Sequence, residues 1–168
     1  MRINDRFDPQ IRRLIDLAFV TARRLQWLPP LLIRLFVGYF FFETGWAKAH
    51  NLDGFAERFA GWGIPHPAFN AALSAYTEMI GGILTMFGLA TRLVSIPMII
   101  NMLVAILAVN LKSVSGIDDF VELDEPLYAL CYLWLLIAGP GAISIDRILV
   151  RALRFRQPSH ESEPVSFA

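Results

Sequence analysis

Four long apolar stretches constrain this chain more than any other feature of its sequence. A helix that crosses the hydrocarbon core of a bilayer, about 30 Å thick, needs about 20 mostly apolar residues. Stretches of that kind run over residues 28–49, 67–89, 93–111 and 126–143. Backbone groups in lipid must be hydrogen-bonded within the chain, and the period-two pattern of barrel strands is absent. We therefore expect an all-α integral membrane protein with an antiparallel four-transmembrane-helix bundle over residues 28–150.

The composition favours a membrane protein and removes several classes of function. Hydrophobic residues make up 55% of the 168 residues and charged residues only 18%, which is too apolar for an ordinary soluble enzyme. The formal net charge is zero, so no basic excess favours nucleic acid binding. The single cysteine, Cys131, excludes an intrachain disulfide and a cysteine-based zinc site. Nucleotide-binding and hydrolase motifs are also absent. We expect no covalently bound cofactor, so any redox chemistry must use a cofactor that binds non-covalently, such as a quinone.

Basic residues gather at one side of the expected bundle. Eleven arginines lie before the first span, in the turn between the second and third, or after the fourth: Arg2, Arg6, Arg12, Arg13, Arg23, Arg24, Arg92, Arg147, Arg151, Arg154 and Arg156. The other side carries Lys48, Arg58 and Lys112 beside seven acidic residues. Because basic loops stay in the cytoplasm, we expect a bacterial-type inner membrane protein with a cytoplasmic N-terminus and C-terminus.

Two segments flank the expected bundle. Residues 1–27 form a predicted cytoplasmic arm, in which apolar residues recur at helical spacing between arginines. Such an N-terminal amphipathic surface helix would lie on the anionic inner leaflet, and the alternative is that it packs beneath the bundle. Residues 151–168 form a predicted cytoplasmic tail, which we expect to be disordered because it is polar and contains two prolines after Phe155.

Polar residues within the spans are candidates for function, because their insertion into lipid is costly. Arg34 and Lys48 share a face of the first span, and Asn101 lies near the centre of the third. Glu78 lies near the middle of the second span, on a face that it shares with the small residues Ala71, Ser74, Ala75, Gly81, Gly82 and Thr85. We expect an ion pair between Arg34 and Glu78 and a polar intramembrane site around these four residues. Two interpretations stay open. The pair only fixes helix register, or the pair or an unpaired Glu78 lines a polar pocket that binds a quinone-like head group or relays protons.

A second group of polar residues lies near the outer membrane surface. Glu43, His50 and His66 have side chains that can bind a metal, and they define a second candidate site. Their spacing matches no known ligand pattern, so we favour a solvated loop and expect no metal. At the opposite side, the Gly139–Gly141 segment should end the fourth helix. Ser144 should then cap a short basic helix that begins near Asp146, whose carboxylate favours a helix N-terminus.

Several short motifs resemble those of a known family. They are Arg34 with Gly38, Gly45-Trp46-Ala47-Lys48, Gly63-Ile64-Pro65, Glu78-x-x-Gly81-Gly82, Gly88-Leu89-Ala90-Thr91-Arg92, and Gly139-Pro140-Gly141-Ala142-Ile143-Ser144-Ile145-Asp146. In this order and spacing they resemble the DoxX family of small four-helix membrane proteins, over about residues 28–150. The resemblance implies that Arg34, Lys48, Glu78 and Asp146 are family positions, whereas Glu43 matches none. It also implies an inner-membrane subunit beside a redox or maturation partner.

These observations support two hypotheses of function. The first is a membrane subunit or partner of a quinone-linked oxidoreductase, with a polar site around Arg34 and Glu78; a stand-alone enzyme is not expected. The alternative is a non-catalytic scaffold or maturation partner in a redox-stress or metal-binding-peptide system, which recruits soluble proteins. A small-solute carrier is less favoured, because four spans are few and no inverted repeat is visible. We expect membrane lipid and a redox or maturation protein as partners and no nucleic acid, and the small-residue helix faces are compatible with a homo-oligomer.

Overall fold

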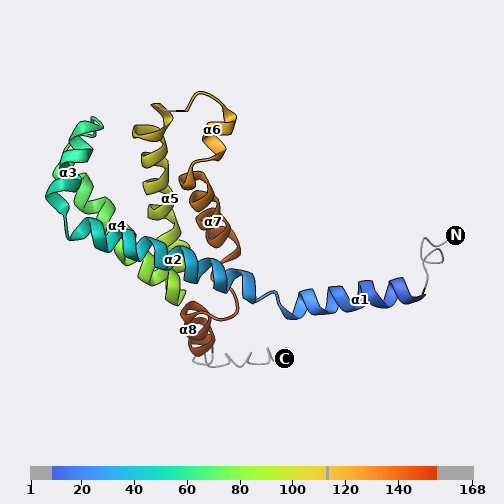
Figure 1. Ribbon diagram of the computed structural model, residues 1–168. Coiled ribbons are helices and arrows are strands. Elements are labelled where there is room, and N and C mark those ends of the chain that lie inside the picture. The colour runs from blue at the N-terminus through green and yellow to red at the C-terminus, as the bar shows by residue number, and fades with distance from the viewer. Residues whose placement is uncertain (1–8, 113, 155–168) are drawn as a thin grey trace, which may run out of the picture.

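The computed structural model describes residues 9–112 and 114–154, and within these ranges it contains helices and no strands (Figure 1). The prediction of an all-helical chain is therefore confirmed. Helix α2 has the predicted bounds, and the ends of α4, α5 and α7 differ from the predicted ones by at most five residues. The helices are α1 (Pro9–Arg24), α2 (Leu28–Ala49), α3 (Leu52–Gly61), α4 (Pro67–Phe87), α5 (Thr91–Ala108), the 3-10 turn η2 (Asn110–Lys112), α6 (Ile117–Val121), α7 (Asp124–Ala138) and α8 (Ile145–Arg154).

The described helices differ in their capacity to cross a membrane. By length and composition, only α5 among them passes as a spanning helix by itself. Residues Gln10–Arg24 and Leu28–Ala49 pass together, as a pair bent by 47°. Helices α2 and α4 contain ionisable side chains, and α7 has 15 residues, a length of about 22 Å. The four-span bundle therefore stays a prediction.

Glycines bring α2 and α4 into close contact along their length. A Cβ atom on Gly38 would lie 2.7 Å from Met86 Cγ. A Cβ on Gly45 would collide with the backbone of Met79, and one on Gly82 would collide with the backbone of Phe42. Small residues allow helix backbones to approach in this way. These contacts fix the register in which the two helices face each other.

The interior has two hydrophobic clusters. One joins α2, α5 and α7, and the other packs α3 against α4. The small-residue face that the sequence places on the second span is confirmed, because its seven members are the buried residues of α4: Ala71, Ser74, Ala75, Glu78, Gly81, Gly82 and Thr85. This face carries one ionisable residue, and the packing of α4 therefore determines what Glu78 contacts.

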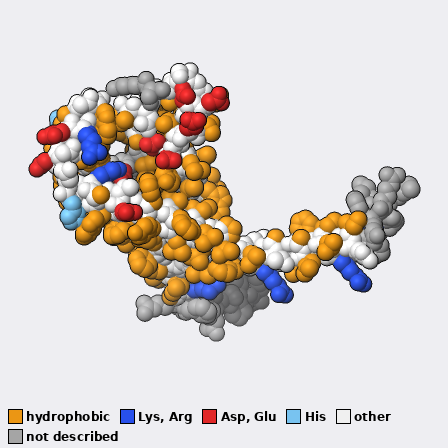
Figure 2. Space-filling view, in the orientation of Figure 1, with side chains coloured by type: hydrophobic (Ala, Val, Ile, Leu, Met, Phe, Trp, Pro, Cys, Tyr) orange, Lys and Arg blue, Asp and Glu red, His pale blue; other side chains and the backbone are white. Residues whose placement is uncertain are grey.

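Large apolar side chains cover much of the outer surface. Leu35, Phe36, Ile80, Leu93 and Leu107 are all exposed. Figure 2 shows hydrophobic side chains as a broad region between one end with many acidic residues and another with basic residues. Such a large apolar surface is unusual for a soluble monomer and suits contact with lipid.

The outer loop and the N-terminal helix differ in part from the predictions made for them. The predicted outer loop is wrong in part, because residues 52–61 form α3 and bury Phe55 and Phe59 against α4. Helix α1 is exposed along its described length except at the half-buried Arg12, and it projects away from the other helices (Figure 1), so the idea that it packs beneath the bundle is wrong. Its position on the leaflet stays a prediction.

The segment after α7 follows the prediction closely. Helix α7 ends at the glycine-proline-glycine segment, and Ser144 Oγ accepts a hydrogen bond from the Arg147 amide at 3.3 Å. The basic helix α8 then runs to Arg154, beyond the predicted boundary at residue 150. Residues 155–168, which we expect to be a disordered tail, lie outside the described residues.

Candidate functional site

The Glu78 carboxylate is the centre of a buried polar cluster. Only 3% of the residue is exposed. Lys48 Nζ donates to Oε1 at 2.6 Å and to Oε2 at 2.5 Å. Thr44 Oγ1 donates to Oε2 at 3.1 Å, and Asn101 Nδ2 donates to Oε1 at 2.8 Å. One carboxylate thus joins α2, α4 and α5, and its charge is matched by a cation and two neutral donors, as a buried charge requires.

Lys48 connects this cluster with the exterior. Its side chain is 31% exposed, and its ammonium lies 5.2 Å from the centre of the Phe55 ring on α3. This distance allows a cation–π contact. In the ion pair of Lys48 and Glu78, the Glu78 side chain is therefore buried, whereas the Lys48 side chain is partly exposed to the exterior.

The predicted ion pair between Arg34 and Glu78 is wrong. Arg34 is 2% exposed, and its guanidinium donates only to backbone carbonyls in the part of the chain that the structure describes. Two of these carbonyls, Thr85 and Met86, belong to the last turn of α4, at 3.1 and 3.0 Å. The other two follow α7: Pro140 and Ile143, each at 2.6 Å.

The register of α2 against α4 explains why the prediction failed. Gly45 faces Ala75 and Met79, which sets Thr44 and Lys48 against Glu78. Arg34 then lies opposite the C-terminus of α4, about 10 Å along the helix from Glu78. The last carbonyls of a helix lack partners within it and carry partial negative charge, so a cation is stabilised there. A substituent at Gly88, whose φ is +64°, would collide with the Arg34 guanidinium at 2.6 Å.

Asp146 supports the same end of the molecule in an unexpected way. The sequence suggests that its carboxylate stabilises its own helix, α8. Instead, its two oxygens accept hydrogen bonds from the amides of Ala90 at 2.7 Å and Thr91 at 3.0 Å, which open α5. The Asp146 amide also donates to Gly88 O at 3.0 Å. Asp146 therefore ties α8 to the turn between α4 and α5.

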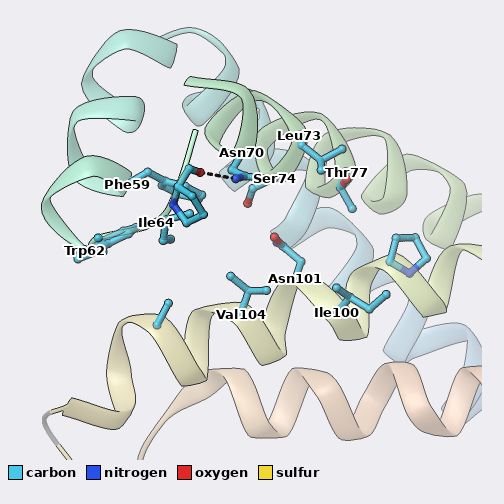
Figure 3. A pocket seen from close by; sticks show the side chains of 14 residues that line it. Phe59, Trp62, Ile64, Asn70, Leu73, Ser74, Thr77, Ile100, Asn101 and Val104 are labelled. Atoms are coloured by element: carbon cyan, nitrogen blue, oxygen red, sulfur yellow. Dashed lines mark hydrogen bonds between the residues drawn. The ribbon is translucent and has the colours of Figure 1, made fainter. Parts of the chain in front are cut away.

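A cavity of about 720 Å³ lies between α4, α5 and the loop after α3. Figure 3 shows Phe59, Trp62 and Ile64 on one wall, and Ser74, Thr77 and Asn101 directed towards the interior. Neutral polar side chains are thus set among apolar ones. Ligand sites with few polar groups in a mostly apolar lining are common.

A second cavity, of about 300 Å³, lies beside the first. Both are lined by Phe59, Trp62, Ser74 and Asn101, whereas Lys48 and Glu78 line only the second. Asn101 therefore lies at the boundary, with its side chain in contact with Glu78 and with the larger cavity. Sequence reasoning identified Asn101, Lys48 and Glu78 but missed Thr44 and the aromatic wall. The four-residue spacing of Phe55 and Phe59 was an available signal of that helical wall.

The structure does not gather the residues of the second predicted site, Glu43, His50 and His66, into a metal-binding cluster. Glu43 is exposed on α2, and His50 directly follows that helix. The His50 ring is tilted by 40° against the Trp46 ring, with 4.3 Å between the ring centres, and its Nδ1 lies 2.9 Å from Trp46 O. His66 precedes α4 in a left-handed conformation, with φ of 47°. Within residues 9–112 and 114–154, no three His, Cys, Asp or Glu side chains are grouped so as to hold a metal ion.

Comparison with known proteins places the chain in a family. The DoxX family model matches residues 30–111, which contain Arg34, Lys48, Glu78 and Asn101. The chain is also 39% identical over 117 residues to the Bacillus subtilis (strain 168) protein named "Putative oxidoreductase CatD", across 69% of this chain and 83% of that protein. The chain belongs to the DoxX family. The family resemblance seen in the sequence motifs is thus confirmed.

Two further relatives of this DoxX chain are named as membrane proteins. "Uncharacterized membrane protein Rv3486" of Mycobacterium tuberculosis is 33% identical over 134 residues, across 72% of this chain and 82% of that protein. "Inner membrane protein YqjF" of Escherichia coli is 26% identical over 127 residues, across 76% of this chain and 96% of that protein. No solved structure is significantly similar to the chain. This DoxX chain is a membrane protein, and the comparisons assign no reaction to it.

Proposed function

We propose that this DoxX protein is the membrane component of a quinone-linked oxidoreductase system and that its larger cavity receives the quinone ring. One observation carries the proposal: the cavity wall formed by Asn101 is hydrogen-bonded at 2.8 Å to a buried carboxylate, Glu78. The cavity thus adjoins a buried ionisable group. The name of the CatD relative is consistent with redox chemistry.

The proposal includes a topology. We propose that α2, α4, α5 and α7 all cross the inner membrane, with the N-terminus and C-terminus in the cytoplasm. The apolar outer surface of these helices supports this arrangement, and so does the concentration of arginines near α1, the start of α5 and α8. The cavities would then open near the outer side of the membrane, since they adjoin α3 and the end of α5.

The lining suits a flat, weakly polar ring. Phe59 and Trp62 provide aromatic surfaces, whose offset stacking with another ring is favourable. The hydroxyl groups of Ser74 and Thr77 and the amide of Asn101 are hydrogen-bond donors for ring carbonyls. A quinone supplies reversible two-electron, two-proton chemistry, and the electrons would pass to or from the partner enzyme. Glu78, which accepts a hydrogen bond from Asn101, is the buried ionisable group next to this ring site.

The test is to purify the full chain in native lipid particles and to measure its quinone content. We expect enrichment over an unrelated four-helix membrane protein, and we expect Glu78→Gln and Asn101→Leu to reduce it. Glu57→Gln is the matched control, because Glu57 is an exposed glutamate on α3 that lines neither cavity. Quinone at the background level in the parent chain would refute the proposal. It would favour the alternative, a scaffold for a maturation or redox-stress system.

A further inference from the structure

The opposite end of the molecule has a separate cavity of about 620 Å³, formed by the start of α5, the segment after α7 and α8. It shares no lining residue with the cavities of about 720 and 300 Å³ described above. Arg92 and Arg147 are its two cationic lining residues, and Leu93, Leu149 and Val150 are its large aliphatic ones. Cations and exposed aliphatic side chains thus occur together in one hollow.

The two arginines are available to a ligand. Both are exposed. Arg92 Nη2 donates to Ile137 O at 3.2 Å, which occupies one of its five N–H donors. In the described part of the chain, no hydrogen bond or ion pair engages the Arg147 side chain. Planar guanidinium groups bind phosphate oxygens in a bidentate manner, so the pair suits a phosphodiester.

Asp146 also lines this cavity, but its carboxylate repels a bound anion only weakly. Asp146 uses both carboxylate oxygens to accept the amides of Ala90 and Thr91. Its negative charge is therefore directed at the positive end of α5. Arg34 lies near enough to contribute a favourable Coulomb interaction with Asp146.

The apolar part of the hollow indicates that the ligand is a lipid. Leu93 is 71% exposed at the start of α5, the helix that passes as a spanning segment by itself. On α8, Ile148 and Leu153 are 66% and 64% exposed, beside Arg147 and Arg151. A short helix with exposed aliphatic and basic residues is typical of the membrane interface. A free phosphate ion has no apolar part that could contact the aliphatic side chains of this cavity.

We propose that this hollow binds one anionic phospholipid, with Arg92 and Arg147 on the phosphodiester and Leu93, Leu149 and Val150 against the acyl chains. The bound lipid would connect the start of α5 with α8. The proposal does not depend on quinone binding, because it concerns a different cavity. It requires only that the chain is a membrane protein.

The test uses the full chain in detergent micelles, with bound lipids counted by native mass spectrometry. We expect phosphatidylglycerol to bind in preference to phosphatidylcholine, and excess inorganic phosphate not to displace it. Removing one arginine charge should weaken phosphatidylglycerol binding about fivefold. Arg92→Gln and Arg147→Gln are the two test variants, and Arg147→Gln leaves every side-chain hydrogen bond described above in place.

Arg24→Gln is the matched control, because Arg24 is an exposed arginine at the end of α1 and does not line the hollow. Its phosphatidylglycerol affinity should stay within about twofold of the parent. Equal binding of the two lipids, or an equal loss in Arg24→Gln and Arg147→Gln, would overturn the proposal in favour of general charge attraction. Displacement by inorganic phosphate would also overturn it, because the ligand would then be an ion.

Discussion

Coupling between Lys48 and Glu78 should be measurable, whereas coupling between Arg34 and Glu78 should be absent. Removing one partner of a fully buried ion pair costs about 3–5 kcal/mol. Because Lys48 is 31% exposed, solvent screening reduces the expected coupling free energy to about 1–3 kcal/mol. Arg34 shares no hydrogen-bond partner with Glu78 among the described contacts. Its effect should add to that of Glu78→Gln within about 0.5 kcal/mol.

The assay is a pair of double-mutant cycles on the full chain. The first cycle combines Lys48→Met with Glu78→Gln, and the second combines Arg34→Gln with Glu78→Gln. The free energy of unfolding is measured in mixed micelles by reversible titration with a denaturing detergent, followed by tryptophan fluorescence. Larger coupling in the second cycle than in the first would refute the register that we describe for α2 and α4. Coupling below about 0.5 kcal/mol in both would show that neither cation interacts with the carboxylate.

Three further perturbations test other parts of the structure. Gly45→Leu should destabilise the fold by about 1–3 kcal/mol or more, because its side chain meets the α4 backbone; unchanged detergent unfolding would contradict the close contact. Asp146→Ala should cost about 1–2 kcal/mol through the lost cap of α5, as measured by the same unfolding titration, with a smaller loss for Asp146→Asn. Hydrogen bonds from the hydroxyl and amide of Ser115 hold the pKa of Asp119 below its ordinary value. This stabilisation is complete above the ordinary aspartate pKa and is lost as pH falls through the lowered one. Acid should therefore lower the protection factor of the Ser115 amide, measured as its hydrogen-exchange rate relative to the intrinsic rate at the same pH, and Asp119→Asn should abolish that pH dependence.

Local sequence patterns were sufficient to locate the four long apolar helices and the buried face of α4. Apolar runs of membrane length predicted α2, α4, α5 and α7, because helix formation in lipid depends on local hydrogen bonding. The spacing of small residues around Glu78 predicted which face of α4 is buried, since helical periodicity is a local property. The glycine-proline-glycine break and Ser144 likewise predicted the end of α7 and the start of α8.

Which polar groups meet depends on how the helices pack against one another. Arg34 and Lys48 lie on the same face of α2, so the sequence offered two cations for one carboxylate. The contact of Gly45 with Met79 selected Lys48, because backbone packing fixes the axial register of two helices to within one turn. Asp146 is likewise 55 residues from Thr91 in sequence, and its role at the start of α5 depends on where α8 packs. Local patterns report which side of a helix is buried, but the partner across an interface depends on the packing of both surfaces.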